Sequence, residues 1–253
     1  MLFGKPKPTV TSEDQEWIED AFIWLEEQYG REYLKSLKII EPTKEFFDHQ
    51  FTGTEADAEY ALKKLTEYMD LKGTNIELYY FSESPMEFED EGIVATQNSN
   101  GTGTQDNYAL GTYSEDGPNK FEIGLDLSQL KDPQSMIATL AHELSHMVLL
   151  GEGRLEENDE ELTDLNCIAL GLGIFISNSI FNFQQWQGSS HQGWQANRQG
   201  YIPEEVAAYA LALFNNYQNN QSDWHQHLNK SMTKLYKKNL KYLQSTTDEL
   251  RFK

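Results

Sequence analysis

Residues 132–151 read DPQSMIATLAHELSHMVLLG, and this stretch predicts one long helix. Asp132 is a residue type that caps helix N-termini, and Pro133 follows it at the first helical position, where its fixed backbone angle suits a helix. Gly151 is well placed to end the helix. Apolar residues recur between these ends at helical spacing and predict a buried face: Ile137, Leu140, Leu144 and Val148.

The same helix carries the motif H-E-x-x-H at residues 142–146. Four residues separate His142 from His146, so both imidazoles lie on one face, one turn apart. Both can therefore reach one ion at the roughly 2.0–2.1 Å of a zinc–nitrogen bond. Glu143 is angled away from that ion. It is placed to take a proton from a zinc-bound water as the water attacks a carbonyl group.

A second predicted helix, from about residue 159 to about residue 180, supplies further acidic groups. A catalytic zinc needs a third protein ligand, and Glu160 is the expected one. Asp164 lies four residues later on the same face, where it can accept the second ring N–H of a ligand histidine. Glu161 is the alternative ligand closest to Glu160, although it points about 100° away around the helix.

Together the two motifs resemble those of the gluzincin metallopeptidases. In that family H-E-x-x-H is followed by N-E-x-x-S-D or E-x-x-A-D, and here HELSH is followed by DEELTD at residues 159–164. The resemblance covers residues 132–166, although the 14-residue separation of His146 and Glu160 is shorter than in many gluzincins. It implies that His142, His146 and Glu160 hold a zinc ion. It also implies that Glu143 is the general base and that Asp164 supports a ligand histidine. Residues 201–214 are also similar to uncharacterised bacterial proteins with this motif.

A peptidase of this kind needs a group that stabilises the oxyanion formed during the reaction. The family motif does not locate it, but His191, Arg198 and Tyr201 lie in or beside a polar, aromatic loop after the second helix. We take Arg198 and Tyr201 as the candidates. A structural role is the alternative for each of them; Tyr201, for example, could be a hydrophobic staple before Pro203.

The fold class expected from the whole pattern is α+β, as a single zincin-like domain over residues 1–253. Residues 1–131 are expected to hold a small mixed or antiparallel sheet, and residues 132–253 to be helical and to carry the metal site. The expected strands are Leu37–Ile40, Asn75–Phe81, about Ile93–Ala95, Tyr108–Tyr113 and Lys120–Leu127. The other expected helices begin at Ser12 and Thr54 and span Tyr201–Tyr217 and Asp223–Leu243. Lys120–Leu127 is the expected edge strand for pairing with an extended peptide.

Charge and composition narrow the possible partners. The 41 acidic and 20 basic residues give a net charge of −21, which disfavours binding to nucleic acid or to an anionic membrane. Cys167 is the single cysteine, so an internal disulfide and a cysteine-rich zinc site are excluded. The N-terminal residues lack the apolar core of a signal peptide, and the longest apolar run, residues 167–176, is too short to cross a membrane. A cytoplasmic location is therefore expected.

These observations favour a zinc metallopeptidase that binds one zinc ion and hydrolyses a peptide or protein substrate. The first alternative keeps the zinc without hydrolysis, as a structural or regulatory zinc protein or a protein-interaction module. The second is a helical interaction module in which the motif is accidental. Cleavage preference and oligomeric state are left open by these patterns.

Overall fold

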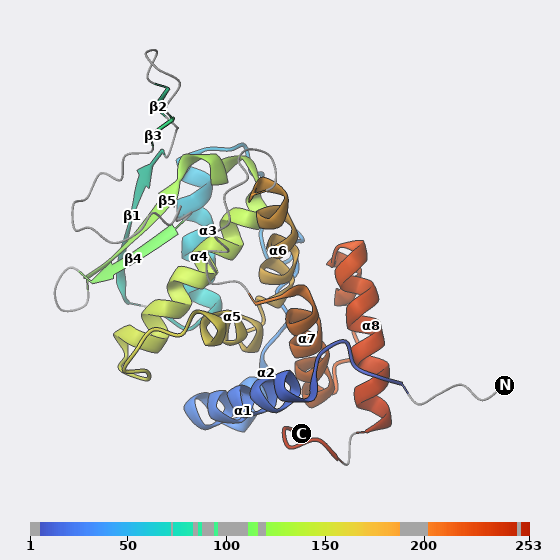
Figure 1. Cartoon of the computed structure of the whole chain (residues 1–253). Helices are drawn as coiled ribbons and strands as arrows, with labels where there is room; N and C mark the ends of the chain where they lie inside the picture. The colour runs from blue at the N-terminus through green and yellow to red at the C-terminus, as the bar shows by residue number, and fades with distance from the viewer. Residues whose placement is uncertain are drawn as a thin grey trace.

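A computed structural model of the chain describes residues 6–71, 73–82, 86–87, 94–95, 111–115, 120–187, 202–246 and 249–253. The described part is mixed α/β and mostly helical (Figure 1). Its α-helices are α1 (Ser12–Tyr29), α2 (Arg31–Ser36), α3 (Glu55–Tyr68), α4 (Pro133–His146), α5 (Glu160–Ala169), α6 (Gly173–Gln187), α7 (Glu204–Gln218) and α8 (Lys230–Ser245). None of these helices is long and apolar enough to cross a membrane.

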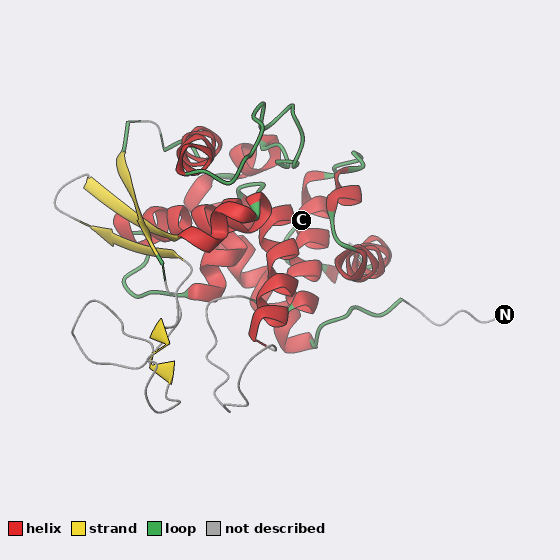
Figure 2. Ribbon diagram, turned by 90° about the horizontal axis from the view of Figure 1, so that it is seen from above, coloured by secondary structure: helices red, strands yellow, loops and turns green. Residues whose placement is uncertain are grey.

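The strands lie in the first half of the chain, as expected, and at one side of the helices (Figure 2). The main sheet has the order β1–β5–β4, with β1 (Asn75–Phe81), β5 (Lys120–Asp126) and β4 (Gly111–Glu115). β5 pairs parallel with β1 and antiparallel with β4, so the sheet is mixed. Two further strands, β2 (Met86–Glu87) and β3 (Val94–Ala95), form a separate antiparallel pair.

The expectation that Lys120–Leu127 forms an edge strand is wrong. Hydrogen bonds to β1 on one side and to β4 on the other place β5 in the middle of the described sheet. The alternation in its sequence reflects two differently packed faces, which a central strand also has. β5 ends at Asp126, whose side chain accepts the backbone N–H of Ser128, and Leu127 begins a 3-10 turn with 38% of its surface exposed.

Helix α4 begins and ends close to the predicted positions. The side chain of Asp132 accepts the backbone N–H groups of Gln134 and Ser135, which caps the helix. The helix then buries nearly its whole length between the sheet with α3 on one side and the helices α5 and α6 on the other (Figure 1). Beyond His146 the chain continues as one π-helical turn, Met147–Gly151, so Gly151 ends the helical run as expected.

Two predicted features near residue 171 are wrong, and they share a physical cause. The expected helix 159–180 is divided into α5 and α6, because Gly171 has φ +87° and the intervening turn packs against the segment Leu37–Ile40. A Cβ atom on Gly171 would lie 2.3 Å from the backbone oxygen of Lys38, so only glycine fits. Leu37–Ile40 is therefore not a strand; its residue Ile40 donates a backbone hydrogen bond to Gly171 at 2.9 Å.

The remaining corrections concern helix ends. The helix expected over Asp223–Leu243 is divided into a 3-10 turn, Trp224–His227, and α8, because Asn229 caps α8 by accepting the N–H of Met232. Helix α1 begins at Ser12, as expected, and its capping box joins Thr11 and Asp14. The expected start of α7 at Tyr201 lies outside the described residues, and the helix itself begins at Glu204 after Pro203.

Candidate metal centre

The two motif histidines lie on the buried face of α4. Each of them has 7% of its surface exposed, and their Nε2 atoms are 3.0 Å apart. The rings are nearly perpendicular, at 87°, so the two nitrogen atoms converge on one point. This convergence is what the i, i+4 spacing predicts.

Glu160 completes the group from the first turn of α5. Its Oε2 atom lies 3.0 Å from Nε2 of His142 and 3.1 Å from Nε2 of His146. Helix α5 starts at this residue because the side chain of Asp159 accepts the N–H of Leu162. Asn158 donates a hydrogen bond of 2.8 Å to the other carboxylate oxygen of Glu160, which fixes its orientation. The neighbouring Glu161 is exposed and is not a member of the group.

These three side chains could hold a metal ion. Their ligand atoms form a nearly equilateral triangle with sides of 3.0–3.1 Å. Three ligands at roughly 2.0–2.1 Å from a tetrahedral ion lie roughly 3.3 Å apart, so small side-chain adjustments would suffice. The histidine side chains are only 9% exposed but that of Glu160 is 42% exposed, which leaves the group accessible from the Glu160 side.

The second nitrogen of each imidazole has a partner on α5. Nδ1 of His142 is 2.9 Å from Oδ1 of Asp164, whose other oxygen accepts the backbone N–H of Ile202 at 3.0 Å. Nδ1 of His146 is 3.3 Å from the hydroxyl oxygen of Thr163, which donates its own proton to the backbone oxygen of Asp159. Both partners therefore favour a proton on Nδ1 and leave Nε2 as the nitrogen that faces Glu160, as metal ligation requires.

The electrostatics of the group favour a positive charge at its centre. Burial alone would lower the pKa of His142, but its hydrogen bonds to Asp164 and Glu160 outweigh burial and raise the pKa to about 10. The same contacts with His142 and His146 hold the pKa of Glu160 far below its usual range. Surroundings that stabilise an imidazolium ion in this way also stabilise a metal cation.

Glu143 lies directly beside the group and is 7% exposed. Burial raises the pKa of its carboxyl group, although the two neighbouring histidines act in the opposite direction. A carboxylate with a raised pKa is a better proton acceptor near neutral pH than an exposed glutamate. Glu143 thus has the environment expected of a general base.

A buried polar network joins α4 to α5 behind the group. Ser145 donates a hydrogen bond of 3.0 Å to the backbone oxygen of Thr163 and accepts one of 2.8 Å from Asn166. Asn166 in turn accepts a hydrogen bond from the hydroxyl of Tyr29 on α1. Ser145 and Asn166 have no exposed surface, so this network fixes how the two ligand-bearing helices pack.

Not every residue selected from the sequence can be placed. Arg198 and Tyr201, the candidates for oxyanion stabilisation, and also His191, lie outside the described residues. Thr163 was missed, although its position immediately before Asp164 puts it beside the second histidine and could have suggested its role. No pattern in the sequence gives His49 a partner, but in the structure it contacts Asp57, eight residues away.

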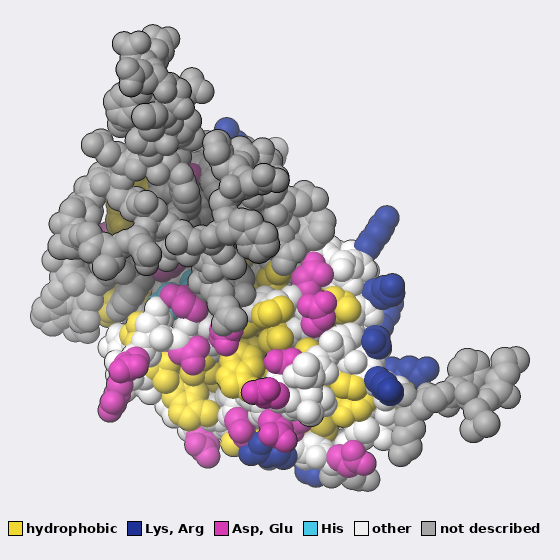
Figure 3. Space-filling model, in the orientation of Figure 1, with side chains coloured by type: hydrophobic (Ala, Val, Ile, Leu, Met, Phe, Trp, Pro, Cys, Tyr) yellow, Lys and Arg dark blue, Asp and Glu magenta, His cyan; other side chains and the backbone are white. Residues whose placement is uncertain are grey.

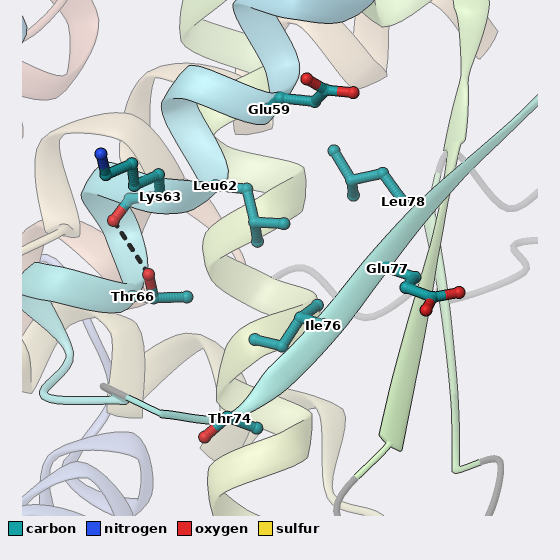
Figure 4. A pocket seen from close by; sticks show the side chains of 8 residues that line it. All are labelled: Glu59, Leu62, Lys63, Thr66, Thr74, Ile76, Glu77 and Leu78. Carbon is teal, nitrogen blue, oxygen red and sulfur yellow. Dashed lines mark hydrogen bonds between the residues drawn. The ribbon is translucent and has the colours of Figure 1, made fainter.

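Two cavities in the described part of the chain lie away from the group. One, of about 520 Å³, lies between α3 and β1, with Leu62, Ile76 and Leu78 at its apolar centre and Glu59, Lys63 and Glu77 around them (Figure 4). The other, of about 200 Å³, is lined by residues that include Tyr29, Val148 and Arg154. Neither of these two cavities contains a residue of the His–His–Glu group.

Comparisons of the chain with known protein families, with curated proteins and with solved structures found no match in any of the three.

Proposed function

We propose that this chain is a zinc metallopeptidase of the gluzincin type with a zincin-like fold. The observation that carries the proposal is the convergence of His142, His146 and Glu160 on one point, at mutual distances of 3.0–3.1 Å. Two residues outside the triangle support it. Asp164 holds the ring of His142, and Glu143 is buried directly beside the group.

The set of donor atoms favours zinc over other metals. Two imidazole nitrogens and one carboxylate oxygen are a common ligand set of catalytic zinc, which keeps a fourth position open. Calcium and magnesium prefer sites made of oxygen ligands alone, and softer metals prefer sulfur. The single cysteine, Cys167, is buried and donates a hydrogen bond to the backbone oxygen of Ala141.

In the proposed hydrolysis each residue in and around the group has its own role. Zinc, when bound, lowers the pKa of a water molecule to about 7 and polarises a substrate carbonyl. Glu143 accepts the proton of the attacking water and passes it to the leaving amine. Asp164 and Thr163 hold the imidazoles in position through their Nδ1 atoms. The donor that stabilises the oxyanion is proposed to be Arg198 or Tyr201.

An extended peptide could bind along β4 rather than along β5. β5 has neighbours on both sides, whereas β4 pairs only with β5 within the described sheet, and β4 contacts α4. A strand with one unpaired edge can hydrogen-bond to an added strand. We therefore assign the peptide-binding role that the sequence suggested for residues 120–127 to residues 111–115.

The first experiment is elemental analysis of protein purified without chelators. We expect about one zinc per chain in the wild type and none in His146→Ala or Glu160→Ala, because a site that loses one of three ligands binds weakly. Glu161→Ala is the matched control: it removes the same charge from the next residue, which is exposed, and should retain zinc. A wild type without metal, even after zinc is supplied, contradicts the proposal.

Peptidase activity is then tested with a peptide library, with Glu143→Gln as the inactive control. Cleavage by the wild type alone supports the enzyme. Stoichiometric zinc without cleavage of any peptide would instead favour the non-catalytic zinc-binding module. The cytoplasmic location and the exclusion of nucleic-acid and membrane partners remain proposals based on charge and composition.

A further inference from the structure

Helix α8 differs in charge from the rest of the molecule. It contains five lysines and no acidic residue, whereas the whole chain has 41 acidic and 20 basic residues. The remainder of the chain therefore carries −26, five charges more negative than the net −21. The five residues, which we call the lysine stripe, are Lys230, Lys234, Lys237, Lys238 and Lys241.

The lysine stripe occupies one face of α8. Each member has another member three or four residues away along the helix, although Lys237 and Lys238 are adjacent, and all five are exposed. The other exposed residues of α8 are serine and glutamine only. In Figure 3 dark-blue side chains project along the edge of the molecule that α8 forms. The stripe is roughly 16 Å long, because a helix rises 1.5 Å per residue.

This arrangement does not serve the stability of the helix. Like charges three or four residues apart repel one another, and Lys230 stands in the first turn, where the helix dipole disfavours a positive charge. Within the described residues none of the five lysines forms an ion pair that would offset this repulsion. The stripe therefore leaves five positive charges facing solvent.

The opposite face of α8 limits what that partner can be. Met232, Tyr236 and Leu243 are buried, and α8 packs against α7. Because its apolar face is already covered, α8 cannot lie in a membrane interface as an amphipathic helix does. The exposed face also lacks aromatic side chains, which stack on nucleic-acid bases, and arginine, which binds phosphate with two parallel hydrogen bonds.

We propose that the lysine stripe binds an acidic segment of a partner protein. Lysines three and four residues apart match carboxylates with the same spacing on a helix, or the closely spaced carboxylates of an acidic extended segment. The strongly negative remainder of the molecule confines such a partner to the stripe and repels polyanions that extend beyond it. The proposal does not depend on the metal centre or on peptidase activity.

The test measures binding of fluorescent poly-L-glutamate to the full chain at low ionic strength. The wild type should bind, and added salt should weaken the binding because it screens exposed charges. Replacing all five stripe lysines with glutamine should weaken binding by about tenfold or more. The matched control replaces five exposed lysines elsewhere, which gives the same net charge and should leave binding unchanged: Lys7, Lys38, Lys44, Lys63 and Lys131.

Far-UV circular dichroism of both variants checks that α8 remains folded. Equal binding by the stripe variant and the control contradicts the proposal, as does a wild type that does not bind. Tighter binding of oligothymidine or of phosphatidylserine vesicles through the same lysines would also overturn it, because the partner would then be a nucleic acid or a membrane. Salt-sensitive self-association lost in the stripe variant would reassign the surface to a second copy of the chain.

Discussion

The described residues include two histidine–aspartate pairs with a buried aspartate, and the two pairs look alike locally but differ in their surroundings. In the first, Nδ1 of His142 lies 2.9 Å from Asp164. In the second, Nε2 of His49 lies 2.6 Å from Asp57. Asp164 has no exposed surface and Asp57 has only 2%. The distance between the histidine nitrogen and the carboxylate oxygen therefore does not separate the two pairs.

The hydrogen bonds of Asp57 show that the second pair is structural. Its Oδ2 atom accepts the backbone N–H groups of Thr52, Gly53 and Thr54 at 2.7–2.9 Å, which fixes the turn into α3. His49 then covers the remaining oxygen and stacks on Tyr60, with a centroid distance of 4.3 Å. The acceptor capacity of the carboxylate is thus used to hold the backbone.

Asp164 is used differently. It accepts one backbone N–H, that of Ile202, and its other oxygen orients His142. The far nitrogen of that imidazole then meets His146 and Glu160. What distinguishes a candidate site from a structural pair is therefore the convergence of further ligand atoms on the second ring nitrogen.

The largest effect is expected for Glu143→Gln. If Glu143 is the general base, peptidase activity should fall by roughly 10²–10⁴-fold while zinc content stays unchanged, because glutamine cannot accept the proton. Steady-state cleavage of a library-derived peptide, together with elemental analysis, measures both quantities. Asp57→Asn is the comparison variant and should leave both unchanged. Full activity in Glu143→Gln would remove this residue from the proposed mechanism.

The next effect concerns stability. Asp57→Ala should lower the free energy of unfolding by about 3 kcal/mol, because it removes a helix cap and leaves buried backbone donors without a partner. Urea unfolding followed by circular dichroism measures the change. Asp48→Ala, which removes an exposed carboxylate nearby, should change stability by less than about 0.5 kcal/mol. Equal effects of the two changes would contradict the structural role.

Glu143 and the residues around it illustrate what could be predicted from the sequence. The H-E-x-x-H spacing and the cap at Asp132 are local signals, so Glu143, both histidines and the start of α4 followed directly from them. Glu160 and Asp164 also depend on local spacing once α5 is recognised. The expectation that the two helices lie side by side came from the ligand requirement of zinc and from the resemblance, because no local pattern shows it.

Other features depend on contacts distant in the sequence and were missed for that reason. The break at Gly171 is imposed by the backbone of Lys38, and the central position of β5 by its parallel pairing with β1. The Asp57–His49 contact was missed for another reason: the two residues are only eight apart, but the turn that brings them together has no distinctive motif. Local patterns thus predicted most helices and the grouping of His142, His146 and Glu160 better than they predicted how the strands pair.

The pH dependence of stability should reveal the structural role of the Asp57 carboxylate. Burial would raise the pKa of Asp57, but hydrogen bonds from Thr54, His49, Thr52 and Gly53 outweigh it and hold the pKa well below the usual range. A lowered folded-state pKa stabilises the protein above the unfolded pKa of about 4, and this contribution is lost as pH falls further.

Chemical denaturation between pH 6 and pH 2, values of roughly two units on either side of that pKa, should therefore show declining stability in the wild type. In Asp57→Asn the decline should be smaller, because asparagine does not titrate. An identical pH profile for the two proteins would show that Asp57 does not contribute in this way.

Asp164→Asn should weaken zinc binding by roughly 10–100-fold, the usual effect of losing a carboxylate that orients a ligand histidine. Competition with a chromophoric chelator measures the affinity. The reciprocal comparison is Asp57→Asn, which should bind zinc like the wild type. Unchanged affinity in Asp164→Asn would mean that the two histidine–aspartate pairs do not differ in the proposed way.

The smallest effect is expected at Thr163. Thr163→Val removes the hydroxyl that faces Nδ1 of His146 but keeps the side-chain shape, and it should weaken zinc binding by less than about tenfold. Thr163→Ser retains the hydroxyl and should restore most of the affinity in the same chelator assay. A serine variant as weak as the valine variant would point to packing rather than to the hydrogen bond.

The contacts between the two ends of the chain have a consequence for biosynthesis. Glu19 on α1 accepts the backbone N–H groups of Arg251 and Phe252, and Phe252 stacks on Phe22 at 5.3 Å. Thr9 likewise binds Asn239. On a ribosome that adds roughly 5–20 residues per second, α1 therefore waits roughly 10–50 s for these partners. During that interval its apolar face is a natural target for chaperones that hold nascent chains.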